Sequence, residues 1–132
     1  MYGSLFWIEW FDRLDRILTS IRTDLATLSR AVSPRGLAAV ERSTRQLSAL
    51  AHDLKLLDID VLRGVGNPPG PEQADGLKQA LDSTVRQLTN LAGLKDAGDR
   101  GDSERMIAAV DSALRDSRYE AAMLLEPRRR RA

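Results

Sequence analysis

Residues 5–32, LFWIEWFDRLDRILTSIRTDLATLSRAV, carry the pattern that decides the fold. Eight apolar residues recur in it at alternating spacings of four and three: Trp7, Phe11, Leu14, Leu18, Ile21, Leu25, Leu28 and Val32. On a helix this spacing places them along one stripe, as in the heptad repeat of a coiled coil. Charged residues such as Asp12, Arg13 and Arg22 fall off the stripe. The segment therefore predicts a long amphipathic helix with coiled-coil-like packing.

The next segment continues the same rhythm and predicts a second helix over about 34–62. Ser33 suits the N-cap, and Pro34 suits the first turn because its missing amide is not needed there. So short a connection favours an antiparallel helical hairpin over a kinked continuation. The stretch LDIDV at 57–61 also fits a period-two strand, although the continuing heptad stripe favours helix.

Two further amphipathic segments follow after Gly- and Pro-containing breaks, and they predict helices over about 71–94 and 103–126. Asp102, Ser103 and Glu104 suit the cap and the negatively charged first turn of the last helix. Pro127 is expected to end it, leaving residues 127–132 as a basic tail. The predicted fold class is all-α: antiparallel hairpins forming a four-helix bundle, with residues 1–126 as a single domain.

Composition excludes several classes of site. The 132 residues include no cysteine and one histidine, so disulfides, thiol catalysis, zinc-thiolate sites and multi-histidine metal sites are all ruled out. The net charge of +1 argues against a protein that coats DNA. No signal peptide or membrane-spanning helix is expected, and we expect a cytoplasmic or virion setting. The many arginine, alanine and glycine residues favour a high-GC bacterium or its phage as the source.

The sequence predicts no catalytic, cofactor-binding or metal-binding residue. His52 neighbours Asp53, but adjacent helical residues do not face each other, and no activated serine is marked. A loop with Asp96, Asp99 and Asp102 lacks the calcium-loop pattern, and Gly64 to Gly66 lack that of a phosphate loop. We therefore expect a non-enzymatic protein.

The aromatic residues are unevenly placed. Five of the six fall within the first eleven positions: Tyr2, Phe6, Trp7, Trp10 and Phe11. A helix that is apolar nearly all round is buried, against its own chain, another subunit or partner, or a membrane interface. We expect a partner interface formed by Phe6, Trp7, Trp10, Phe11 and Leu14, with the other two fates as alternatives.

The four arginines of the tail are Arg128, Arg129, Arg130 and Arg131. They suit weak, salt-sensitive contact with nucleic acid, anionic lipid or an acidic protein, or simply a solvated tail. The leading functional hypothesis is an assembly protein that self-associates or docks on a larger complex through its N-terminal helix. A peripheral membrane protein using the same aromatics is the alternative, followed by accessory nucleic-acid binding through the tail.

Overall fold

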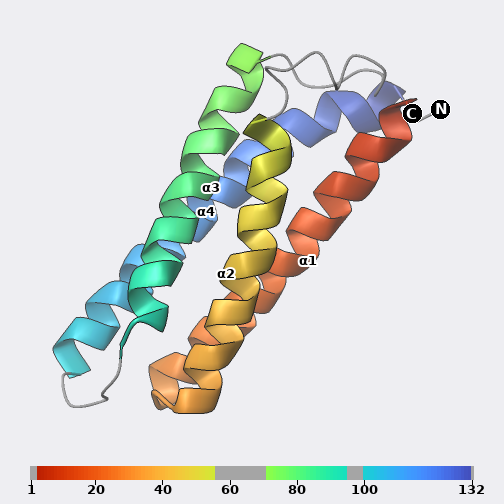
Figure 1. Ribbon diagram of the computed structural model, residues 1–132. Coiled ribbons are helices and arrows are strands. Elements are labelled where there is room, and N and C mark those ends of the chain that lie inside the picture. The colour runs from red at the N-terminus through yellow and green to blue at the C-terminus, as the bar shows by residue number, and fades with distance from the viewer. Residues whose placement is uncertain (1–2, 56–70, 95–99, 132) are drawn as a thin grey trace.

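The computed structural model describes residues 3–55, 71–94 and 100–131, and within them the side chains of 9–55, 74–94 and 102–125 (Figure 1). This part of the chain is helical throughout, apart from short connections. Its four helices are α1 (Gly3–Arg30), α2 (Pro34–Lys55), α3 (Pro71–Ala92) and α4 (Arg100–Arg131). The predicted all-helical bundle is confirmed at this level.

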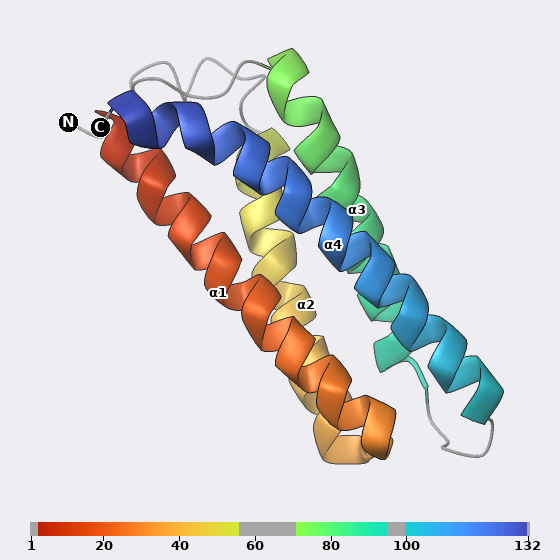
Figure 2. The same ribbon diagram turned by 180° about the vertical axis from the view of Figure 1, so that it is seen from behind.

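The helices pack as a ring in chain order. α1 contacts α2, α2 contacts α3, α3 contacts α4, and α4 returns to contact α1. Figure 1 shows α1 running away from the end that holds the N and C labels and α2 running back toward it. α3 and α4 repeat this reversal (Figures 1 and 2). The first turns of α1 and the last turns of α4 therefore lie at the same end of the bundle.

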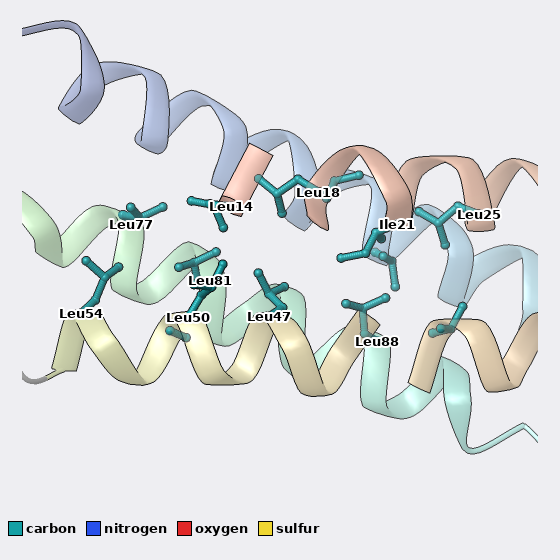
Figure 3. Close-up of a cluster of buried hydrophobic side chains, with 14 of the residues drawn as sticks. Leu14, Leu18, Ile21, Leu25, Leu47, Leu50, Leu54, Leu77, Leu81 and Leu88 are labelled. Carbon is teal, nitrogen blue, oxygen red and sulfur yellow. The ribbon is translucent and has the colours of Figure 1, made fainter. Parts of the chain in front are cut away.

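The apolar stripe of α1 forms one wall of a continuous core. Its side chains point inward toward leucines of α2 and α3 (Figure 3). The largest fully buried side chains of the whole core are Leu14, Leu18, Ile21, Leu28, Leu47, Leu54, Leu77, Leu81, Leu88 and Leu91, together with Trp10. Each such side chain contributes about 1.5–3 kcal/mol by leaving water. Between Phe11 and Leu28, the stripe predicted from the spacing is therefore the buried face of α1.

Between α3 and α4 the core contains a polar pair. The hydroxyl groups of Thr84 and Ser117 lie 2.8 Å apart, and both side chains are fully buried. The Thr84 hydroxyl donates its proton to the Ala80 carbonyl at 2.8 Å, so Ser117 is the donor in the contact between the two hydroxyls. A satisfied buried pair of this kind fixes how α3 and α4 sit along each other.

The predicted cap of α2 is confirmed. The Ser33 hydroxyl accepts a hydrogen bond of 3.0 Å from the amide of Gly36, the third residue of the helix, and Pro34 is the first. Gly36 also allows the α1–α2 connection to pack closely. A Cβ at this position would lie 2.7 Å from Cδ2 of Leu28, which is itself buried.

Several helix ends differ from those predicted. α1 and α3 end at Arg30 and Ala92, two residues early, and α4 begins at Arg100, three residues early. The second helix begins at Pro34 as predicted, whereas its expected end near residue 62 and the alternative strand at 57–61 lie outside the described residues. The prediction that Pro127 ends the last helix is wrong, because α4 continues to Arg131. Proline removes one backbone hydrogen bond and bends a helix, but the residues after it still accept helical dihedral angles.

Truncating the buried stripe should cost far more stability than truncating its charged neighbour. We expect Leu18→Ala to lower the free energy of unfolding by about 2–5 kcal/mol, because it leaves a cavity in the core. Arg16 is exposed, and Arg16→Ala should cost less than about 1 kcal/mol. Urea denaturation measures both values. Equal losses would contradict the assignment of the buried face.

Removing the cap should weaken the start of α2. We expect Ser33→Ala to lower the free energy of unfolding by about 0.5–2 kcal/mol, since the Gly36 amide loses its acceptor. Ser33→Asp, which restores an acceptor at the N-cap, should recover most of the loss. Thermal denaturation of the two variants would contradict this assignment if the aspartate variant were no more stable than the alanine variant.

Candidate functional site

Three of the residues expected at a partner interface belong to the internal core. Trp10, Phe11 and Leu14 are only 0%, 2% and 1% exposed. The Trp10 indole Nε1 donates to Asp53 Oδ2 on α2 at 3.1 Å, and its ring packs edge-on against Phe11 with centroids 5.0 Å apart. α2 and α4 of the same chain therefore bury these three side chains, and their role at a partner interface stays a prediction.

Phe6 and Trp7 lie in the first turns of α1, and their side chains fall outside the described part of the structure. A periodic stripe identifies which face of a helix is buried but not which surface buries it. The sequence therefore locates the aromatic cluster. Which surface buries it depends on how the other helices are arranged, and the sequence does not show this.

Two hollows lie between α1 and α4, the two helices that face the viewer in Figure 2. One hollow, of about 290 Å³, lies toward the start of α1. It is lined by Phe11, Asp12, Leu14, Asp15, Leu18, Arg118, Ala121, Ala122 and Leu125. A second, of about 400 Å³, lies further along the same two helices. It is lined by Arg22, Leu25, Ala26, Ser29, Glu104, Ile107, Ala108 and Asp111.

A third hollow, of about 220 Å³, lies where α1 ends, between residues 28–32 and residues 103, 104 and 107. We call these three hollows together the α1/α4 groove. Small side chains produce it: Ala121 and Ala122 border the first hollow, and Ala26 and Ala108 the second. Core residues such as Phe11 and Leu25 give it apolar surface, beside charged residues such as Asp15.

Arg118 crosses the groove from α4 to α1. Its Nη2 atom donates to Thr19 Oγ1 at 3.3 Å and lies 3.9 Å from Asp15 Oδ1. The side chain is 35% exposed, so water screens the ion pair, which contributes about 0–1 kcal/mol. This contact bridges the two helices at the first hollow and can rearrange at small cost.

Two large apolar side chains project from α4, one of the two helices that form the groove. Tyr119 is 64% exposed and Met123 is 59% exposed, and they are the exposed large hydrophobic residues of the described chain. They lie four residues apart on α4, which places them one turn apart on one face. Their neighbours Arg118 and Ala122 line the first hollow. The sequence signal for this pair was weak, because two apolar residues on a polar face form no stripe.

The arginine tail is part of α4. Residues 128–131 are helical, and their side chains lie outside the described part. Figures 1 and 2 both show the end of α4 beside the start of α1. The aromatic and arginine-rich segments, which are at opposite ends of the sequence, are therefore brought to one end of the bundle.

The other candidate residues from the sequence form no cluster with one another in the described part of the chain. His52 is exposed on α2, and Asp102 pairs with Arg105 on α4. The described side chains contain no group of three or more potential metal ligands. Among the described helices, none combines the length and the apolar character that crossing a bilayer requires. Asp96, Asp99 and the 64–66 segment lie outside the described residues.

Comparisons with known proteins give no match to any protein-family model, curated protein or solved structure. The function of this chain is therefore inferred from its own residues. The strongest features are the α1/α4 groove, the exposed pair on α4 and the meeting of the two chain ends.

A polar contact between α1 and α2 provides a titration test of the packing. The Ser43 hydroxyl donates to Asp24 Oδ2 at 3.4 Å. Burial raises the pKa of the Asp24 carboxyl above 3.8, although the hydrogen bond from Ser43 and the charge of Arg42 act in the opposite direction. The folded state thus holds this proton more tightly than the unfolded chain. Its contribution to stability is present below pH 3.8 and is lost as the pH rises through the higher folded-state pKa.

We expect Asp24→Asn, which stays neutral and keeps an acceptor for Ser43, to be more stable than the wild type at neutral pH. The difference should disappear on acidification below pH 3.8, where Asp24 is neutral as well. Thermal denaturation over a pH series measures it. Asp116→Asn, at an exposed position of α4, controls for the loss of one negative charge. A less stable Asp24→Asn variant at neutral pH would contradict the prediction.

Proposed function

We propose that this chain is a non-enzymatic assembly protein that self-associates through the side of the bundle formed by α1 and α4. The observation that carries the proposal is the exposed pair Tyr119 and Met123 on α4, one of the two helices that form the α1/α4 groove. Exposed aromatic side chains that enter a pocket dominate the energy of many interfaces. The same helix, α4, carries both the projecting side chains and residues that line the hollows.

A second copy of the chain is the occupant that this arrangement favours. In a two-fold symmetric pair, the projecting residues of each copy would meet the hollows of the other. The same surface of both copies would then form a self-complementary interface. Leu14 and Phe11 contribute the floor of the first hollow. The N-terminal helix therefore takes part in the proposed interface by lining it, in place of the exposed anchors expected from the sequence.

The proposal includes antiparallel, coiled-coil-like packing of α1, which the unbroken burial of its stripe supports. It also includes assembly with itself or within a larger complex, in the cytoplasm or a virion. The sequence has 17 arginines and only 3 lysines, and this ratio supports a bacterial or phage source. The single imidazole and the absence of cysteine support a role without catalysis.

The test is the molar mass in solution of a variant with charges at the projecting pair. We expect wild-type protein to exceed its monomer mass of 14.6 kDa and to dissociate on dilution. Tyr119→Asp with Met123→Asp should weaken association at least about tenfold, because each buries a charge at the interface. Sedimentation or light scattering at two concentrations measures this.

The matched control is Ser48→Asp with His52→Asp, also four residues apart and exposed, but on α2. It should leave the mass unchanged. A wild-type protein that stays monomeric at high micromolar concentration would overturn self-association, and equal dissociation of the control would overturn this surface. Surface changes are cleaner than deletion of residues 1–11, which would remove Trp10 and Phe11 from the core.

A further inference from the structure

The end of the bundle where α1 begins and α4 ends combines two unlike segments. α1 begins at Gly3, and its first turns carry Leu5, Phe6, Trp7 and Ile8. α4 ends at Arg131 after four consecutive arginines. Both views show these two helix ends side by side (Figures 1 and 2). An aromatic segment and an arginine segment thus share one end of the molecule.

The heptad register of α4 changes character at this end. Its inward-facing positions alternate by four and three residues, and they are Ser103, Ile107, Val110, Leu114, Ser117, Ala121 and Leu124. The next two positions in this register are Arg128 and Arg131. The stripe of α4 therefore stops being apolar where α1 is richest in aromatic residues. Core formation alone does not explain arginine at these positions, because buried charges need partners.

Charge at this end favours an anionic ligand. Residues 3–9 carry one acidic residue, Glu9, and residues 126–131 carry one, Glu126, against four arginines. Arginine binds phosphate through paired N–H donors and remains charged at any physiological pH. The chain as a whole has a net charge of only +1, so the positive charge is concentrated locally.

We propose that this end of the bundle docks on an anionic lipid surface, with Arg128 to Arg131 binding headgroup phosphates and Phe6 and Trp7 entering the interfacial layer. Stable attachment to a membrane surface usually needs two signals, such as an apolar element and a polybasic one. The two helix ends supply one each. This attachment uses residues that do not line the α1/α4 groove, so the proposal does not rest on self-association.

Lipid fits this end better than nucleic acid. The aromatic residues of α1 are accompanied by the aliphatic residues Leu5 and Ile8, which favour the acyl boundary of a bilayer. Proteins that stack bases place aromatics in a positively charged groove, whereas the first turns of α1 contain no basic residue.

The test is co-sedimentation of the full chain with phosphatidylcholine vesicles, with and without phosphatidylserine. We expect binding to the vesicles that contain phosphatidylserine and little binding to the neutral ones, with a decrease as salt is added. Changing Arg128, Arg129, Arg130 and Arg131 together to Gln should weaken binding at least about tenfold.

The matched control is the change of four exposed arginines elsewhere, Arg30, Arg35, Arg42 and Arg45, to Gln. It removes the same charge and should change binding less than about twofold if the site is at this end. Tryptophan fluorescence provides a second readout. Because Trp10 is fully buried, a blue shift on adding anionic vesicles would report Trp7, and it should persist in Trp10→Phe.

Three results would overturn the proposal. The first is no sedimentation of the wild type with anionic vesicles, and the second is an equal loss of binding in the control variant. The third is tighter binding to single-stranded DNA or RNA than to anionic vesicles at the same salt, which would assign the surface to nucleic acid. The mass measurements on the Tyr119 and Met123 variant are unaffected by any of these outcomes.

Discussion

Burial of the apolar stripe of α1 is the constraint on which the rest of the structure depends. Leu14, Leu18 and Ile21 are inaccessible to water only because α2, α3 and α4 surround them. At about 1.5–3 kcal/mol for each side chain, this burial is large against a typical domain stability of about 5–15 kcal/mol. The hydrogen bond from Trp10 to Asp53 ties the start of α1 to the end of α2, and so restricts sliding along the stripe.

The same core explains why one side of the bundle is hollow. α3 and α4 approach closely: a Cβ on Gly76 would lie 2.5 Å from Oε2 of Glu120, and Thr84 meets Ser117 inside. On its other flank α4 presents Ala108, Ala121 and Ala122 to α1, and these side chains are too short to fill the space. The groove is thus a consequence of residue size on a helix whose position is fixed elsewhere.

Sequence periodicity predicts those features of the fold that are set within a single helix. The stripe of α1 and the cap at Ser33 follow from local spacing and backbone chemistry, and the structure confirms both. The groove is formed by residues that are far apart in the sequence. Asp15 and Arg118, for example, meet across it although about a hundred residues separate them, and no local sequence pattern predicts such a contact. The helical conformation beyond Pro127 was missed for a different reason, because proline disfavours helix continuation without forbidding it.

The proposed self-association surface and the proposed lipid-binding end have different orientations, so both can be used at the same time. The groove runs along the bundle, whereas the arginine-rich segment lies at its end (Figures 1 and 2). In a pair of copies related by a two-fold axis parallel to the helices, both arginine-rich ends face the same way. Attachment of one end would then hold the other close to the same bilayer, raising its effective concentration there without any new contact. Self-association along the groove would therefore strengthen a weak electrostatic attachment that one copy makes alone.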